Sequence, residues 1–124
     1  MTAMKSTAQS RRARRKHSQR LHSMDLLEKR TTFLVTALAK IMKIDPAEFY
    51  SSSNKKHRLA KGRWVIYTLL RNAGYTYAEI AEVVNRTTGA VYYLLRKPRP
   101  TGNAWTEVIN RMAQYEEKWE KKYL

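Results

Sequence analysis

The chain has 124 residues, of which 25 are lysine or arginine and 10 are aspartate or glutamate, so its formal net charge is +15. Because it contains no cysteine, the sequence excludes a disulfide scaffold, a thiol nucleophile and a cysteine-ligated metal site. The length allows one domain with tails, and 43% hydrophobic residues suffice for a modest core. The excess of positive charge predicts a polyanionic partner, either nucleic acid or an anionic lipid surface.

Residues 1–24 form a strongly basic segment with seven lysines and arginines and no acid. Large apolar residues are few there and show no periodicity, so we expect a disordered tail. Two roles fit this composition: an arm that lies along the phosphates of a nucleic acid, or a tail that only aids solubility. An organelle transit peptide and a nuclear-import patch also remain open, whereas a secretory signal would need an apolar core segment.

The first two predicted helices follow the tail. Asp25, with Glu28 three residues later, matches a capping box and predicts a helix that continues to about Lys43. The run Asp45–Glu48 predicts a second, short helix that ends near Tyr50, because an aspartate cap is followed by proline and then by an acid. The apolar residues of the first helix recur at helical spacing: Leu26, Phe33, Leu34, Ala37 and Ile41.

Two more helices are predicted in the middle of the chain. The third runs from about His57 to Ala73, and Gly74 is the residue expected to end it. Thr76 and Glu79 form another capping box, which starts a fourth and shorter helix.

A tight turn and a fifth helix come next. Asn85 and Arg86 predict the turn, since asparagine tolerates the left-handed backbone conformation. Thr87 then caps a helix that continues to Lys97, and Pro98 prevents it from going further.

The last predicted helix is capped by Asn103, and its apolar and aromatic residues form one stripe over residues 104–123. The stripe predicts core packing, with a dimerisation or protein-partner face as the alternative for its outer part. No alternating strand pattern competes with these signals. The sequence therefore predicts an all-α domain of about six helices over residues 25–124, preceded by the disordered tail of residues 1–24.

Residues 76–97 have the dimensions of a helix-turn-helix. If Val91 lies at the centre of the buried face of the second helix, a rotation of about 100° per residue points Gly89, Tyr93 and Arg96 outward. Such a face suits a helix in a DNA major groove, where hydroxyl and methyl groups can contact base edges. A helical hairpin packed into a small bundle is the purely structural alternative.

The basic segment 55–63 adds a second candidate contact. We expect it to grip the DNA backbone, or to place Arg58 in the adjacent minor groove, where the potential favours arginine. Arg86, Tyr92 and Arg96 would hold flanking phosphates. The predicted DNA-binding residues are Lys55, Lys56, Arg58, Lys61, Arg63, Arg86, Thr87, Thr88, Gly89, Ala90, Tyr92, Tyr93 and Arg96.

Four segments between Phe33 and Pro98, about half of the chain, together carry a family resemblance. The helix and the I-D-P-A-E-F step at 33–49 and the basic run at 55–63 come first, followed by E-I-A at 79–81 and R-T-T-G-A-V at 86–91. In this order they resemble the C-terminal DNA-binding domain of the bacterial replication initiator DnaA, whose fold is related to Trp repressor. The corresponding family patterns read I-x-P-E-D-L, A-R-P-R, E-I-G and R-D-H-[ST]-T-V.

The resemblance implies a Trp-repressor-like helix-turn-helix that places Thr88, Gly89 and Ala90 at the turn facing the bases. Because the family's aspartate and histidine are Thr87 and Thr88 here, a different target sequence is implied. The sequence has no G-x-x-x-x-G-K-[ST] phosphate loop, so we expect a stand-alone DNA reader without the initiator's ATPase module.

We therefore expect a sequence-specific double-stranded DNA-binding protein, either a transcriptional regulator or an accessory protein that binds a replication origin. The other hypotheses are binding of RNA or single strands through aromatic residues, and an adaptor that brings a protein partner to DNA through the last helix. The sequence predicts no catalytic constellation, metal site, cofactor or membrane span. With DNA as its partner, we expect a cytoplasmic, nucleoid-associated protein.

Overall fold

In the computed structural model, the backbone is described for residues 8–51 and 57–124, and the side chains for residues 24–51 and 57–124. The described residues form six helices and contain no strand, which confirms the predicted all-α class. The helices are α1 (Ala8–Met42), α2 (Pro46–Tyr50), α3 (His57–Asn72), α4 (Tyr77–Val84), α5 (Thr88–Leu95) and α6 (Asn103–Tyr123).

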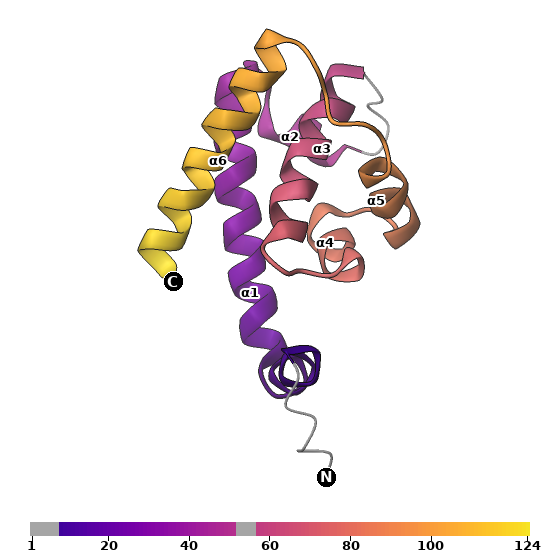
Figure 1. The fold of residues 1–124 in the computed structure, drawn as a ribbon, viewed down its shortest axis with the longest axis vertical. Coiled ribbons are helices and arrows are strands. Elements are labelled where there is room, and N and C mark those ends of the chain that lie inside the picture. Colours follow the sequence, from indigo (N-terminus) through magenta and orange to yellow (C-terminus); the bar gives the residue numbers. More distant parts are fainter. Residues whose placement is uncertain (1–7, 52–56) are drawn as a thin grey trace.

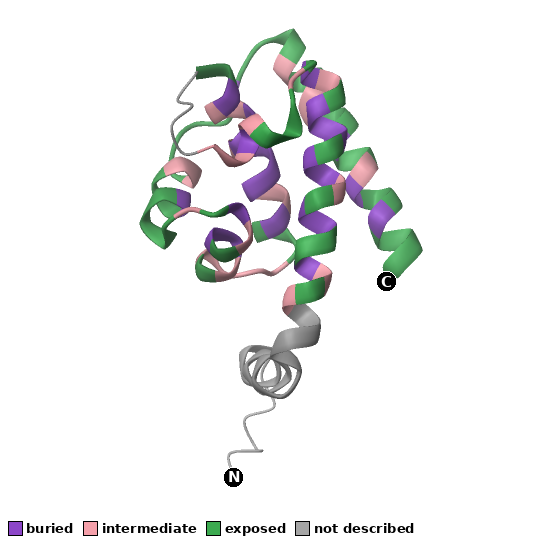
Figure 2. Cartoon of the chain, turned by 180° about the vertical axis from the view of Figure 1, so that it is seen from behind, coloured by how far each residue is buried: buried purple, intermediate pink, exposed green. Residues whose placement is uncertain are grey.

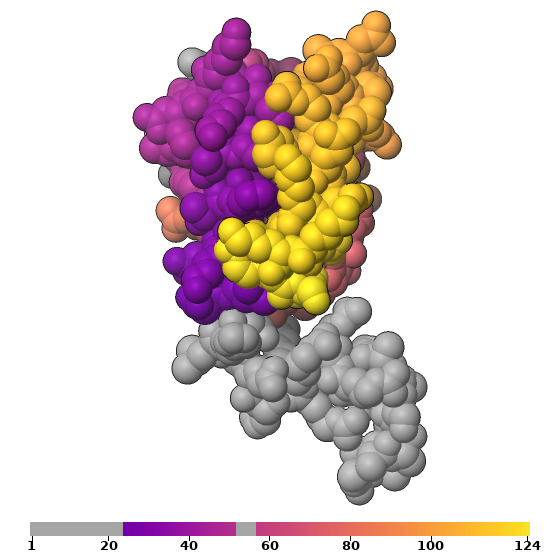
Figure 3. Space-filling model, turned by 90° about the vertical axis from the view of Figure 1, so that its left-hand side faces the viewer, coloured from indigo at the N-terminus to yellow at the C-terminus, as the bar shows by residue number. Residues whose placement is uncertain are grey.

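Three long helices form the body of the molecule (Figure 1). α6 runs beside α1, and the side view of Figure 3 shows the two helices in contact along this face. α3 packs on α1 from another direction, and the short helices α4 and α5 pack on α3 at the edge away from α6 (Figure 1). This arrangement leaves α5 at the periphery of the fold.

The core lies where α1, α3, α4 and α6 meet, as the buried segments in Figure 2 show. Each fully buried leucine, isoleucine, valine or methionine contributes about 1.5–3 kcal/mol by leaving water. Side chains that lose all or nearly all of their exposure include Leu34, Leu38, Ile66, Leu70, Ile80, Val84, Val91 and Met112.

The first helix begins earlier than the sequence indicated, so Asp25 lies inside α1 and does not cap it. Its carboxylate Oδ2 lies 3.4 Å from Lys29 Nζ, as an exposed ion pair one helical turn apart. The residues before Asp25 are rich in good helix formers, and extending a packed helix needs no new nucleus. Of the predicted disordered tail, residues 1–24, the backbone of residues 8–24 is helical, and residues 1–7 lie outside the described residues.

Three local predictions are confirmed at the following helix ends. Asp45 and Thr76 each close a complete capping box, with Glu48 and Glu79 at the third helical position. Gly74 has φ 105°, as expected for a residue that ends a helix. These signals are reliable because both partners of each interaction lie within four residues of each other.

Two helix ends differ from the prediction. α5 ends at Leu95 and not at Lys97, whose amide instead donates to the Leu94 carbonyl in a tighter turn. The cause is Pro98, which disfavours helical backbone in the residue before it. Asn103 is the first residue of α6 and not its cap, because Gly102, with φ 105°, takes the cap position.

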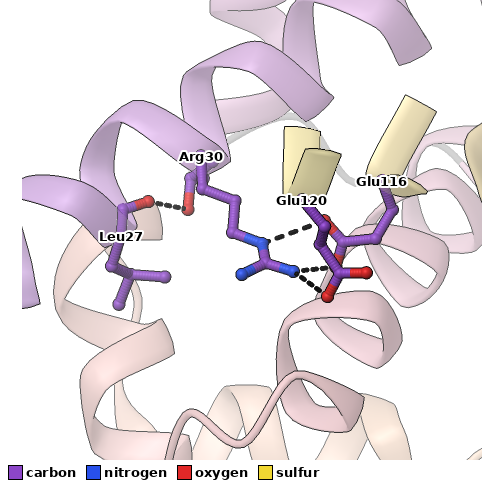
Figure 4. A network of polar contacts seen from close by, with 5 residues as sticks. Leu27, Arg30, Glu116 and Glu120 are labelled. Atoms are coloured by element: carbon purple, nitrogen blue, oxygen red, sulfur yellow. Dashed lines mark hydrogen bonds and ion pairs between the residues drawn. The ribbon is translucent and has the colours of Figure 1, made fainter. Parts of the chain in front are cut away.

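α6 is fastened to α1 by a buried ion pair (Figure 4). Arg30 of α1, only 2% exposed, donates from Nε to Oε1 of Glu116 at 2.9 Å, and its Nη2 lies 2.8 Å from Oε2. Glu120, one turn further along α6, accepts a bond from the same guanidinium at 3.1 Å. The predicted core role of the α6 stripe is confirmed as far as Trp119, which is buried, whereas Tyr123 is 46% exposed.

Candidate nucleic-acid interface

α4 and α5 form the predicted helix-turn-helix. Asn85 has φ 58° and ψ 49°, the left-handed conformation that was expected of it, and it reverses the chain between the two helices. Ala81 of α4 and Val91 of α5 are both buried in the common core. The Thr87 hydroxyl accepts a 3.1 Å bond from the Ala90 amide and so caps α5, as predicted.

The outward face of α5 is open to solvent, which agrees with the exposure expected from the sequence. Val91 is completely buried, and Leu94 and Leu95 beside it are half-buried. Tyr93 is 66% exposed and Tyr92 is 45% exposed, although large aromatic side chains are usually covered. The predicted base-facing or phosphate-facing residues that are exposed on or next to this helix are Thr87, Thr88, Gly89, Ala90, Tyr92, Tyr93 and Arg96.

Each of the two exposed tyrosines of α5 lies beside one cation. The Tyr92 ring meets the Tyr77 ring edge-on, with centroids 5.3 Å apart and planes at 90°. The guanidinium of Arg96 lies 5.6 Å from the Tyr92 centroid. Lys97 Nζ lies 4.9 Å from the Tyr93 centroid. Such cation–π contacts contribute about 0.5–1 kcal/mol each at exposed sites, so the two rings have preferred positions.

Lys97 and Tyr77 were absent from the residues that the sequence assigned to the interface. A signal for Lys97 was present: it follows Tyr93 by four residues, the spacing at which helical side chains are neighbours. Tyr77 gave no such signal, because its contact with Tyr92 joins two different helices. Arg71 of α3 extends the same row, with its guanidinium 4.6 Å from the Tyr77 centroid.

The basic segment 55–63 is divided among several roles. Lys55 and Lys56 lie outside the described residues, so their predicted contacts stay predictions. The guanidinium of Arg58 donates to the carbonyl of Met42, the last residue of α1, and the side chain is otherwise exposed. Lys61 Nζ lies 6.0 Å from the centroid of the Trp105 ring of α6.

The prediction that Arg63 contacts DNA is wrong, because Arg63 is only 4% exposed and cannot reach a partner on the surface. Its Nε donates to the Phe49 carbonyl at 2.9 Å, and its Nη2 donates to the carbonyls of Glu48 and Ser51 at 3.1 and 2.8 Å. These bonds satisfy carbonyls at the end of α2, which a helix leaves without internal partners. Burial first, and then the charge of Arg86, lower the pKa of Arg63.

Arg86 lies at a pocket of about 390 Å³ between α3 and α5. Its Nη2 donates to the Ser51 carbonyl at 3.0 Å, and its Nε is buried without a hydrogen-bond partner among the described residues. The other residues that line this pocket are Ala60, Arg63, Tyr67, Ala90, Tyr93, Leu94 and Lys97.

A second pocket continues along the same seam between α3 and α5. It shares Ala60, Leu94 and Lys97 with the first and adds His57 and Lys61 at the start of α3. The positively charged and basic side chains of both pockets therefore lie beside the exposed face of α5, in agreement with the expected position of the basic segment next to that helix.

Comparison of the chain with protein-family models, with curated proteins and with solved structures finds no match. Among the helices described, none is both long enough and apolar enough to cross a bilayer.

Proposed function

We propose that this protein binds double-stranded DNA, with α5 in the major groove and sequence preference set by the face that carries Thr88, Gly89 and Tyr93. The single observation that carries this proposal is the exposure of that face on a helix held at the edge of the fold by a helix-turn-helix. A helix seated in the major groove needs a free side and a fixed orientation. α5 has both, because Val91 anchors it while the opposite side chains remain in water.

The charge around α5 supports the same proposal. Residues 85–102 contain four lysines and arginines and no acid, so the helix and its flanks carry a net positive charge. Two carboxylates of α6, those of Glu116 and Glu120, bind Arg30 at the other side of the molecule. A phosphate backbone along residues 85–102 would meet the four cations of this segment and none of its own carboxylates, and such contacts supply most of the affinity of non-specific binding.

Individual roles follow from position. Thr88 lies in the first turn of α5, where its hydroxyl can bond a base edge and its methyl can contact a thymine methyl. Gly89 has no atom within 4 Å of the place where a Cβ would stand, so its lack of a side chain serves approach by a partner and not internal packing. Arg96 and Lys97, at the end of the helix, would meet phosphates.

Fluorescence anisotropy with labelled duplexes tests the proposal. The target is first selected from a random duplex library, and affinities are then compared for the selected and a scrambled sequence. Thr88→Arg should change which duplex is preferred, whereas Arg96→Gln should weaken both duplexes alike. If Arg86, Arg96, Lys97 and Arg99 each neutralise one phosphate, their share of the slope of log K against log salt is roughly −3.6. Equal losses on both duplexes for Thr88→Arg would contradict base reading.

The regulatory role is part of the proposal. A transcriptional regulator would occupy promoters, and an origin-binding accessory protein would occupy the origin. Genome-wide footprinting of the sites bound in cells separates the two.

One observation favours a second candidate, the binding of single-stranded nucleic acid. Tyr92 and Tyr93 are exposed and lie beside Arg96 and Lys97, and nucleobases stack on tyrosine rings next to a positively charged track. Competition of single-stranded DNA and RNA against the labelled duplex decides between the candidates. Tyr93→Leu should reduce single-strand affinity by about tenfold or more if stacking dominates, since one base–aromatic stack contributes about 1–3 kcal/mol.

A further inference from the structure

The pocket between α3 and α5 has an unusual electrostatic composition. Two arginines, Arg63 and Arg86, and one lysine, Lys97, line it together with the ring of Tyr67. None of the described residues that line the pocket is an aspartate or a glutamate. A concave site with three cations and no acid in its lining attracts an anion.

Among the described residues, few acceptors contact the side-chain donors of Arg86. A guanidinium has five N–H donors, and the one side-chain hydrogen bond that Arg86 makes within the described residues goes from Nη2 to the Ser51 carbonyl. The Nε of Arg86 is buried and has no hydrogen-bond partner among the described residues. A buried donor without an acceptor destabilises a protein, so an acceptor at this position is favoured.

The positive charge of the neighbouring Arg63 also favours an anion beside Arg86. Arg63 is buried, and the charge of Arg86 acts on it unfavourably, which together lower the pKa of Arg63. Burial raises the pKa of Tyr67, while the two arginines act to lower it. An anion beside Arg86 would offset the repulsion between the guanidiniums, because opposite charges at short range favour the charged forms.

The shape of the pocket suits a compact anion that remains attached to something larger. Its walls are short or apolar side chains, Ala60 from α3 and Ala90 and Leu94 from α5. Ala90 and Tyr93 also belong to the exposed face of α5, so the pocket opens beside the surface proposed to enter the major groove. A polyanion lying on α5 could therefore place one of its groups in it.

We propose that this pocket is a binding site for one phosphate-type oxyanion, with Arg86 as its principal donor and Lys97 as a second cation. This inference rests on the proposed function for its carrier, which would be a phosphodiester of the DNA backbone next to the groove that holds α5. A free or terminal phosphate has the same donor requirements, and the experiment separates these sources. Arg63 contributes charge and holds the end of α2, since its Nε and Nη2 already bond to backbone carbonyls.

Anion binding is measured by nuclear magnetic resonance without DNA. The arginine Nε–H signals of the ¹⁵N-labelled protein are followed while dimethyl phosphate, a phosphodiester, or inorganic phosphate is added at constant ionic strength in chloride. We expect the Arg86 signal to shift in a saturable way with either anion. Saturation with dimethyl phosphate supports a phosphodiester occupant, whereas a response to inorganic phosphate alone would overturn the DNA backbone as the source.

Two variants and a control keep the result independent of folding. Arg86→Gln removes the donor, and Ala60→Leu fills the pocket without changing the charge. Both should lose saturable binding of phosphate, followed for Arg86→Gln on the backbone amides of Ala90 and Lys97, and should lower duplex affinity by about tenfold, the effect of one charge-assisted contact. Arg111→Gln, which removes the same charge from the exposed face of α6, should retain the phosphate response.

The outcomes for the pocket and for DNA binding are separate. If the protein binds duplex DNA but phosphate shifts no pocket signal beyond the effect of chloride, the pocket inference is wrong and the proposed function stands. If phosphate saturates the pocket and no duplex binds, the proposed function is wrong and the anion site stands. A response that Arg86→Gln and Ala60→Leu leave unchanged would also overturn the site.

Discussion

Replacing Glu116 with alanine should destabilise the fold far more than replacing Glu120, although both carboxylates bind the same arginine. Arg30 lies in α1 with 3% of its side chain exposed, and Glu116 has 12% exposed against 48% for Glu120. Burial alone would lower the pKa of Arg30, but the hydrogen bond and the charge of Glu116 outweigh it and raise that pKa. The charge of Arg30 is thus stabilised mainly by Glu116.

The expected loss of stability depends on whether the substitution leaves a buried charge without a partner. Removing one partner of a buried pair costs about 3–5 kcal/mol, because the other charge stays in the interior unpaired. Glu120, 3.1 Å away, can still bind Arg30, so we expect the lower limit, about 3 kcal/mol, for Glu116→Ala. For the half-exposed Glu120, alanine should cost about 0.5–1 kcal/mol, the usual contribution of an exposed ion pair.

Urea unfolding followed by helical circular dichroism measures both values. The slope of the free energy of unfolding against urea concentration should be the same for all variants, so that differences in the unfolding midpoint report differences in stability. A loss of 3 kcal/mol corresponds to a fall of about 10 °C in the midpoint of thermal unfolding. As a matched control, Arg30→Met combined with Glu116→Leu should be within about 1 kcal/mol of the natural protein or more stable, because no buried charge is left unpaired and Glu120 is half-exposed to water. Equal costs for the two single alanine variants would refute the reasoning.

Further stability predictions concern backbone positions. Gly89→Ala should raise the free energy of unfolding by about 0.5–1 kcal/mol, since an added Cβ meets nothing within 4 Å and alanine favours the helix. Gly62→Ala should instead lower it by about 1 kcal/mol, because the Cβ would stand 2.9 Å from Met42 Sδ where α3 approaches α1. Asn85→Gly should be nearly neutral, whereas Asn85→Val should cost about 1–2 kcal/mol at φ 58°. Urea unfolding checks all four variants, and the packing argument fails if the two alanine variants change stability in the same direction.

Much of the fold and the exposed side of the candidate interface could be predicted from the sequence. The all-α class, the capping boxes at Asp45 and Thr76, the left-handed turn at Asn85 and the outward face of α5 all depend on residues a few positions apart. The physical reason is that caps, turns and helical periodicity are local interactions, whose partners are neighbours in the chain whatever the rest of the protein does.

Only the tertiary structure decided what the basic residues do. Arg63 looked like a surface cation in the sequence, yet it is buried and bonds to carbonyls of α2, while Arg86 stands at a pocket that α3 and α5 form together. The sequence could not separate these two arginines, because their burial and hydrogen bonding depend on carbonyls and side chains that belong to other helices. Charge is a property of composition, but whether a charge faces water or the interior is set by how the helices pack.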